Sequence, residues 1–335
     1  MSSLPVRILG TGKALPAKAV TADDMDRRLG LAPGTVAKQS GVLTRYFVDG
    51  ETTSSLGADA ARAALAAAGL EPGDVDAIVG VCGGQEQAIP CTASLIQKAL
   101  GLETSGIPAF DVNSTCLSFL TGLDVVSHLI AAGRYERVLL VASEIASVGL
   151  NWGDRESATI MGDGAAAAVI GRARDGETSR IFGARMETYS EGSELTRLRA
   201  GGTRYHPRQA EDLEAYVSEY ALFEMDGKSV FKYTAQQLPG FVERFFEQVG
   251  STLAEVDLVL PHQASPTAMW LVQRRLGVPP EKFMVIAPEF GNTIAASIPM
   301  ALHEAISRGK LKRGQRGMLL GTSAGFSMGA LLFEY

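Results

Sequence analysis

Short unbroken apolar runs alternate along this chain with longer stretches in which apolar residues recur at helical spacing. Unbroken runs are typical of strands buried on both faces, and a 3.6-residue spacing is typical of amphipathic helices. Strands that alternate with helices predict an α/β fold built from layers. The predicted strands are residues 6–9, 41–47, 75–81, 107–112, 137–142, 256–261 and 283–286, and the predicted helices are 21–31, 54–69, 93–100, 117–133 and 293–309.

The second half of the chain repeats the pattern of the first. The run 256–262 resembles 75–81, which pairs His262 with Val81. This repetition predicts an α/β fold of two βα-rich halves related by a pseudo-twofold axis. The predicted halves are residues 1–175, with the candidate Cys, and residues 176–335, with the candidate His and Asn and a loop-rich insertion at about 184–234.

The polar turn at Cys116 has a counterpart around Asn292. In each half such a turn leads into a predicted helix, and the glycine that ends this helix, Gly133 or Gly309, lies equally far beyond Cys116 or Asn292. We therefore expect Cys116 and Asn292 at equivalent positions, so that two helix N-termini meet at a shared centre.

Cys116 is a candidate nucleophile because it follows a predicted strand and opens a predicted helix. The positive end of the helix dipole favours a thiolate and lowers the pKa of a thiol. The alternative interpretation is a small apolar residue packed in a strand–helix corner.

His262 and Asn292 also follow predicted strands, so the three side chains can meet in the repeated fold. A thiolate attacks a thioester carbonyl, an imidazole supports the thiolate or donates a hydrogen bond, and an amide stabilises developing negative charge. Taken singly, His262 also fits a hydrogen-bonded structural histidine, and Asn292 fits a turn or helix cap.

Composition narrows the class of protein. The 335 residues are 46% hydrophobic and 20% charged, which is typical of a soluble globular protein with a large core. The net charge of −6 argues against a nucleic-acid-binding surface. There is no signal-peptide layout and no apolar run of membrane-spanning length. The three cysteines are too few for a disulfide framework and lack metal-ligand spacing, so we expect a reduced cytoplasmic protein without a metal.

Seven segments together resemble the β-ketoacyl-acyl-carrier-protein synthase III family of the thiolase-like superfamily, over nearly the whole chain. The order Cys, then His-Gln-Ala, then Asn-Thr-x-Ala-Ala-Ser is a specific signal. The segments are residues 41–45, 109–116, 161–169, 225–232, 261–264, 291–299 and the glycine-rich run 321–329.

This resemblance implies a five-layered αβαβα fold in an obligate homodimer. It implies that an acyl-CoA acylates Cys116, and that His262 and Asn292 then promote decarboxylation of malonyl on a carrier protein. The resulting carbanion attacks the acyl-enzyme, in fatty-acid or related polyketide biosynthesis. No cofactor is permanently bound, and acyl-CoA is a substrate.

The resemblance also implies roles for other residues. Backbone N–H groups of Cys116 and Ala324 form the oxyanion hole. Ile89 reaches into the acyl pocket of the neighbouring subunit. Arg155 faces CoA, and Arg45 also binds the substrate or CoA.

Three positions depart from the family pattern. Thr35 and Gln39 stand where priming members carry the Trp and Arg that sandwich the CoA adenine, and Thr267 stands for an Arg used in carrier docking. These departures favour a divergent member with a different acyl chain, a different nucleophile or a secondary-metabolite pathway. The alternatives are acyl transfer from Cys116 to a hydroxyl, amine or water without carbon–carbon bond formation, and a catalytically silent partner subunit.

Overall fold

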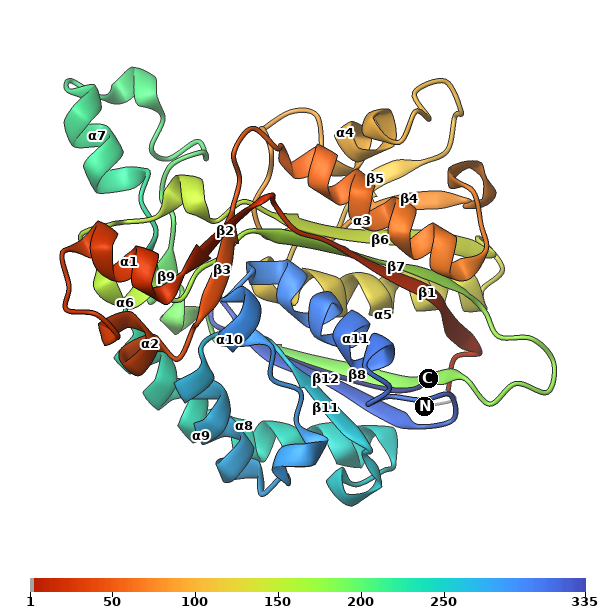
Figure 1. Ribbon diagram of the computed structural model, residues 1–335. Helices are drawn as coiled ribbons and strands as arrows, with labels where there is room; N and C mark the ends of the chain where they lie inside the picture. The colour runs from red at the N-terminus through yellow and green to blue at the C-terminus, as the bar shows by residue number, and fades with distance from the viewer. Residues whose placement is uncertain (1–2) are drawn as a thin grey trace.

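The computed structural model describes residues 3–335, which fold into alternating layers of helices and sheets (Figure 1). Two β-sheets enclose a central pair of helices, α5 (Ser118–Ala131) and α11 (Ser297–Ser307). Two further pairs cover the outer faces of the sheets, which confirms the predicted five-layered αβαβα fold. These outer pairs are α3 (Thr53–Ala68) with α4 (Thr92–Ala99), and α8 (Gly227–Val249) with α9 (Pro266–Leu276).

The two sheets have matching strand arrangements. The first contains β1 (Val6–Ala14), β4 (Ala77–Gly80), β5 (Ala109–Asp111), β6 (Arg137–Glu144) and β7 (Gly164–Arg172). The second contains β8 (Arg180–Thr188), β11 (Leu258–Pro261), β12 (Arg316–Ser323) and β13 (Ser327–Glu334). Their orders are β1-β7-β6-β4-β5 and β8-β13-β12-β11. In both, a parallel pair (β4 with β6, β11 with β12) continues into antiparallel neighbours, as a pseudo-twofold relation requires, and in the first sheet β5 adds a second parallel neighbour to β4.

The strand register confirms the pairing of His262 with Val81. Each residue directly follows the parallel strand pair of its own half. The Val81 N–H donates to the Val141 carbonyl at 2.8 Å, and the His262 N–H donates to the Leu320 carbonyl at 2.8 Å. The two side chains therefore leave equivalent strand ends.

The pairing of Cys116 with Asn292 is wrong by three residues. Thr115 and Ile294 both have positive φ, 53° and 48°, and each opens a 3-10 turn that leads into α5 or α11. The Asn113 Oδ1 accepts from the Thr115 N–H at 2.8 Å, and the Asn292 Oδ1 accepts from the Ile294 N–H at 2.9 Å. Asn292 thus corresponds to Asn113. Counting back from the terminal glycines misplaced it because α5 has 14 residues and α11 has only 11.

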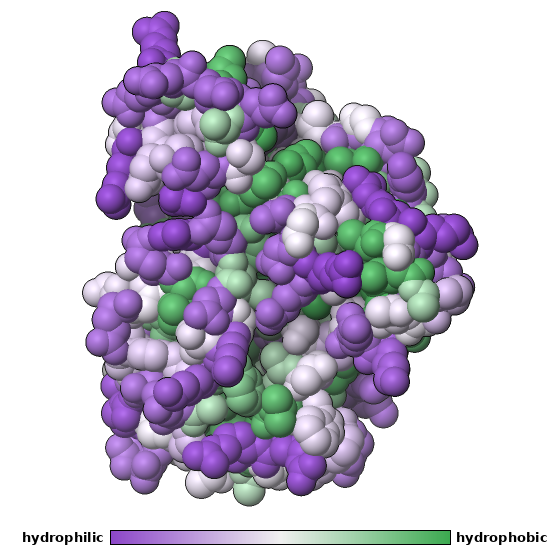
Figure 2. Space-filling view, turned by 90° about the vertical axis from the view of Figure 1, so that its left-hand side faces the viewer, coloured by the Kyte–Doolittle hydropathy of each residue, from purple (hydrophilic) through white to green (hydrophobic). Residues whose placement is uncertain are grey.

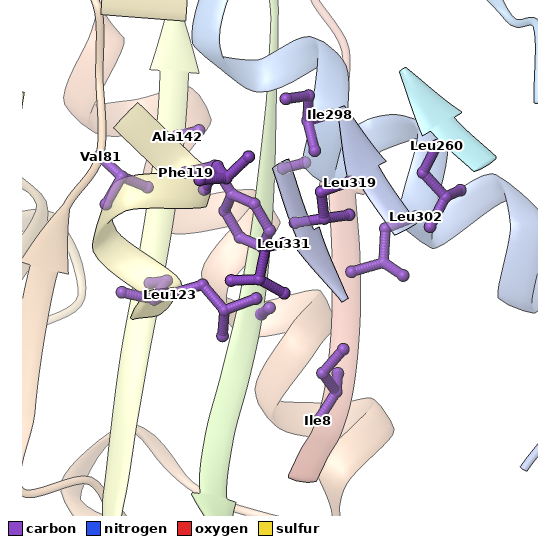
Figure 3. Close-up of a cluster of buried hydrophobic side chains, with 14 of the residues drawn as sticks. Ile8, Val81, Phe119, Leu123, Ala142, Leu260, Ile298, Leu302, Leu319 and Leu331 are labelled. Atoms are coloured by element: carbon purple, nitrogen blue, oxygen red, sulfur yellow. The ribbon is translucent and has the colours of Figure 1, made fainter. Parts of the chain in front are cut away.

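The central layer holds the largest core (Figure 3). Phe119 and Leu123 of α5 lie in the same cluster as Ile298 and Leu302 of α11, and all four are fully buried. Burying such a side chain stabilises a fold by about 1.5–3 kcal/mol. This packing fixes both helices, and therefore their N-terminal turns, between the two sheets.

Gly10 and Gly12 do not end the first strand, because β1 continues to Ala14. A Cβ at Gly10 would lie 2.5 Å from the Ala64 carbonyl oxygen, and one at Gly12 would lie 2.3 Å from that of Ala60. The glycines instead allow the Ala-rich helix α3 to approach the sheet closely.

Residues 184–234 are only partly loops. The first five belong to β8, and the last eight belong to α8, a 23-residue helix that the sequence patterns did not predict. Between them, α7 (Leu213–Tyr220) stands out from the body of the molecule (Figure 1). The predicted strand 283–286 forms only a bridge between Phe283 and Val259. The small elements of this region are β9 (Thr196–Arg197), α7 (Leu213–Tyr220) and β10 (Glu224–Met225).

A small cap made of β2 (Lys18–Thr21), α1 (Ala22–Leu29), α2 (Thr35–Ser40) and β3 (Thr44–Phe47) packs against the segment that joins β6 and β7. The Thr21 side chain accepts from the Asp24 N–H and caps the first helix. Within residues 3–335, no helix combines the length and apolar character needed to span a membrane. The remaining short helices are α6 (Arg155–Ala158) and α10 (Ala287–Phe290).

Candidate active site

Cys116, His262 and Asn292 line one cavity of about 840 Å³. Cys116 lies in the turn before α5, His262 follows β11, and Asn292 lies in the turn before α11. The fold therefore brings together three side chains from segments that are far apart in the sequence. Ala324, in the turn between β12 and β13, lines the same cavity.

Backbone donors surround the Cys116 thiol. The N–H groups of Ala324 and of Cys116 itself are directed at Sγ. Removal from water, followed by the negative charge of Glu144, raises the pKa of Cys116 to about 12. This differs from the expected lowering by the helix dipole, because the loss of hydration outweighs that dipole here. At neutral pH the resting side chain is a thiol, and it needs a proton acceptor when it attacks.

His262 is neutral at physiological pH, because burial lowers its pKa to about 4. Its Nδ1 lies 2.6 Å from the Ser297 Oγ, which also accepts from the Gln263 N–H at 3.3 Å. A hydroxyl can donate to or accept from Nδ1, so Ser297 can hold the ring in either tautomer. In one tautomer Nε2 is a proton acceptor, and in the other it is a donor.

Backbone contacts orient Asn292 as a hydrogen-bond donor. Its Oδ1 accepts from the Ile294 N–H, so the two Nδ2 hydrogens are the groups that it can offer to a ligand. Its own N–H donates to the Ile160 carbonyl at 2.7 Å, and its carbonyl accepts from the Gly162 N–H at 3.0 Å. These bonds attach the turn to the segment that precedes β7.

Glu144 is a buried carboxylate beside the site that the sequence reasoning did not select. It ends β6 and accepts hydrogen bonds from the N–H groups of Gly83 and Gly84, the latter at 3.0 Å. Burial raises its pKa to about 8, opposed by these bonds and by the Ala295 N–H. Its only sequence signal is a carboxylate at the end of an unbroken apolar strand.

Exposed polar residues line the mouth of the cavity. We define the mouth by Gln39, Arg155, Glu156 and Lys228, of which Arg155 is an expected CoA contact. In the view onto this side of the molecule, purple polar side chains surround hollows in which green apolar side chains are visible (Figure 2). Among the departures from the family pattern, Gln39 and Thr267 line the cavity.

The structure places Arg45 away from the cavity. Its side chain is fully buried and donates to the Thr159 carbonyl at 2.6 Å and to the Val42 carbonyl at 3.3 Å. Burial lowers its pKa to about 10. CoA binding by Arg45 does not fit this burial, and its visible role is to tie β3 to the segment after α6.

Ile89 lies on the loop between β4 and α4 and is 85% exposed. It does not line the cavity of its own chain. Among the described residues, no group of three or more His, Cys, Asp or Glu side chains is arranged to hold a metal ion.

Comparisons with known proteins agree with this geometry. Family models described as 3-oxoacyl-[acyl-carrier-protein] synthase III match residues 110–190, and those for its C-terminal part match residues 246–335. A β-ketoacyl-[acyl-carrier-protein] synthase III from Neisseria meningitidis is 33% identical over 330 residues, covering 98% of this chain and 99% of that protein.

Solved structures show the same similarity. The crystal structure of 3-oxoacyl-[acyl-carrier-protein] synthase III from Aquifex aeolicus is 30% identical, with a TM-score of 0.86 and full coverage of both chains. The priming β-ketosynthase of the R1128 polyketide pathway, 24% identical with a TM-score of 0.87, shares the fold over 99% of this chain and 97% of its own.

Proposed function

Because the chain belongs to the β-ketoacyl-acyl-carrier-protein synthase III family, we propose that it is a condensing enzyme. It transfers an acyl group from acyl-CoA to Cys116 and joins that group to malonyl-carrier protein with loss of CO2. The observation that carries the proposal is the cavity itself. It holds a thiol between two backbone N–H donors, beside a neutral imidazole and an oriented amide.

The first step is acylation. The Cys116 sulfur attacks the thioester carbonyl of acyl-CoA, and its proton passes to Nε2 of His262 in the tautomer whose Nδ1–H donates to Ser297. The N–H groups of Cys116 and Ala324 stabilise the oxyanion of the tetrahedral intermediate. When the intermediate collapses, the CoA sulfur leaves and takes the proton from His262. The products are acyl-Cys116 and CoA.

The second step is decarboxylation with condensation. For this step His262 is the tautomer that carries its proton on Nε2, with Nδ1 accepting from the Ser297 hydroxyl. The carbonyl oxygen of the malonyl thioester accepts from this Nε2–H and from Nδ2–H of Asn292. Both donors are neutral, so they stabilise the enolate without protonating it. The carbon–carbon bond to the carboxylate breaks and releases CO2, and the resulting carbanion attacks the carbonyl of acyl-Cys116. Expulsion of the thiolate, which is then protonated, gives the β-ketoacyl-carrier protein.

We place the enzyme in the cytoplasm as a homodimer. A reducing compartment keeps the three free cysteines reduced, which a thiol nucleophile requires. A large apolar side chain that is 85% exposed supports a partner subunit over Ile89. The exposed cations Arg155 and Lys228 at the mouth suit the phosphates of CoA or of a carrier-bound phosphopantetheine.

The test is intact-protein mass spectrometry with acyl-CoA, followed by malonyl-carrier protein. We expect a mass increase on Cys116 that disappears when malonyl-carrier protein is added, together with a β-ketoacyl product. An adduct that survives malonyl-carrier protein but clears with an alcohol or amine would replace condensation by simple acyl transfer.

A further inference from the structure

Glu144 is buried beside the site and takes no part in the two proposed steps. It is the last residue of β6, a strand that is paired on both sides, with β4 and with β7. Its side chain is only 1% exposed. The carboxyl group therefore extends from a fixed strand end into the interior, where a polar group needs hydrogen-bond partners.

Backbone N–H groups from both halves of the chain bind this carboxyl group. Oε1 accepts from Gly83, and Oε2 accepts from Gly84 at 3.0 Å. A third bond comes from the N–H of Ala295. The two glycines line the cavity in the loop after β4, and Ala295 lies in the 3-10 turn before α11. We call Glu144 with these three N–H groups the Glu144 clamp.

The clamp lies where the loop after β4 meets the two turns that open the central helices. A Cβ at Gly83 would lie 2.8 Å from Cγ2 of Ile294, and 3.4 Å from both Oε1 of Glu144 and the carbonyl carbon of Thr115. Thr115 directly precedes Cys116. The missing side chain at Gly83 thus allows the loop to contact both turns and the carboxyl group at once.

The bond to Ala295 bears on the orientation of Asn292. Two consecutive N–H groups of this turn are bound, that of Ile294 by Oδ1 of Asn292 and that of Ala295 by Glu144. The first bond turns the Asn292 amide so that Nδ2 is free to donate to a ligand. The second bond attaches the same turn to the half of the chain that carries Cys116.

We propose that Glu144 is a positioning residue for the condensation step, because the Glu144 clamp holds the turn that carries Asn292 in place relative to Cys116. This inference rests on the proposed function, which supplies the reaction. Acylation does not share this dependence, since its two oxyanion donors, the N–H groups of Cys116 and Ala324, are not among the groups that the clamp binds. Loss of the clamp should therefore separate the two steps.

The first variant is Glu144→Gln, which keeps the size of the side chain. Both oxygens of a carboxyl group can accept hydrogen bonds, whether or not it is ionised, whereas the amide nitrogen of glutamine only donates. The N–H of Gly83 or of Gly84 therefore loses its partner. We expect CO2 release from malonyl-carrier protein by the acyl-enzyme to fall about ten- to hundredfold, as for a small misplacement of a reacting group, while acylation of Cys116 changes less than about threefold.

The second variant, Glu144→Asp, keeps both acceptor oxygens and shortens the side chain by one methylene. From the fixed end of β6 it is too short to bind the loop and the turn together, so we expect the same selective loss of CO2 release. It also serves if Glu144→Gln does not fold. The matched control is Asp26→Asn, which changes a buried carboxylate that accepts from the N–H groups of Gly34 and Val36 in the cap. It should change both rates in the same proportion.

Two results would overturn the inference while leaving the proposed function intact. One is normal CO2 release by the acylated Glu144→Gln and Glu144→Asp enzymes. The other is an equal loss of acylation and of CO2 release in both variants, as for Asp26→Asn, which would show that Glu144 only stabilises the fold.

Hydrogen–deuterium exchange tests the clamp without any reaction. Mass spectrometry follows the peptides that contain Gly83 and Ala295 in the natural protein and in both Glu144 variants. We expect exchange in these two peptides to become about fivefold faster or more, the equivalent of one lost hydrogen bond. Unchanged exchange overturns the inference whatever the reaction is. Faster exchange in the variants of a protein that releases no CO2 would instead refute the proposed function and retain the clamp.

Discussion

At equivalent backbone positions, the two halves of this molecule present different chemistry. The strand end that carries His262 in the second half carries the buried Val81 in the first. The turn that carries Asn292 in the second half carries Asn113 in the first, with the same bond from Oδ1 to a backbone N–H. Cys116, three residues after Asn113, occurs only in the first half. One half thus carries the proposed nucleophile, and the other carries the two donors proposed to act on the second substrate.

The serine at the start of each central helix shows the same division of roles. Ser118 donates to the Thr115 carbonyl at 2.7 Å and lies 3.3 Å from the Cys82 carbonyl, which ties the backbone together. Ser297, at the equivalent position, contacts the His262 ring instead. A residue type that is structural in one half therefore becomes part of the site in the other, where it contacts a histidine ring.

Removing the nucleophile should have the largest effect. We expect Cys116→Ala to lower acylation by acyl-CoA by about 10⁴-fold or more, since no equivalent thiol exists in the second half. Intact-protein mass spectrometry measures the adduct, and circular dichroism checks that the fold is retained. Continued labelling of Cys116→Ala protein would contradict the assignment of the nucleophile.

The two equivalent asparagines offer a matched pair. Asn292→Ala should reduce CO2 release from malonyl-carrier protein by about 10²- to 10³-fold, the usual loss for one preorganised donor, with acylation retained. Asn113→Ala removes the same backbone bond outside the cavity and should cost about 1 kcal/mol of stability with little loss of rate. Radiolabelled CO2 release and the acyl adduct are measured in parallel. Loss of acylation before decarboxylation would refute this division of labour.

Glu144 joins the two halves, since its carboxylate accepts from Gly83 in one and from Ala295 in the other. Its folded-state pKa of about 8 exceeds the ordinary 4.5, so the folded state binds more protons and stability falls as pH rises through this range. His262, with a pKa of about 4 against the ordinary 6.5, acts oppositely below pH 6.5.

Between pH 6.5 and 8 the effect of Glu144 is therefore unopposed by His262. Denaturant unfolding of the natural protein should lose on the order of 2 kcal/mol across this interval, and Glu144→Gln should remove that slope. Asp76→Asn is the control, because Asp76 is a half-buried carboxylate outside the cavity that also accepts two backbone N–H bonds. An identical slope in Glu144→Gln would contradict this account.

The paired serines should give the smallest effect. Ser297→Ala removes the Nδ1 partner of His262 and should reduce condensation by about tenfold, the equivalent of one hydrogen bond. Ser118→Ala should change the stability and leave the rate closer to normal. The discriminating measurement is the pH profile of condensation, which shifts only if the serine acts through the imidazole. Equal rate losses in both variants would show that the two serines have the same role.

The sequence predicted the parts of the fold that depend on local pattern. Unbroken apolar runs located the buried strands, and the run before His262 was paired correctly with Val81. The long helix α8 was missed although Leu238, Phe241 and Phe245 recur at helical spacing. Its first turns follow a polar insertion, and Pro239, a residue that usually ends a helix, lies inside it.

The properties that depend on three-dimensional surroundings could not be predicted in the same way. The raised pKa of Cys116 follows from its removal from water and from the nearby Glu144. Neither could be predicted from the spacing of residues along the sequence. The three-residue error at Asn292 arose because two helices of unequal length end in the same glycine signal. Arg45 belongs to a recognisable segment, yet its burial excludes the contact with substrate that the segment suggested.

The high pKa of the Cys116 thiol also affects how readily oxidants inactivate the enzyme. Oxidants and electrophiles react with thiolates, so a cysteine that stays protonated at neutral pH is protected while no substrate is bound. In the proposed mechanism, the sulfur becomes reactive only when a thioester occupies the cavity and His262 accepts the proton. The resting enzyme can therefore survive oxidative stress that would inactivate a permanently ionised cysteine, and its substrate should sensitise it to such damage at the moment of attack.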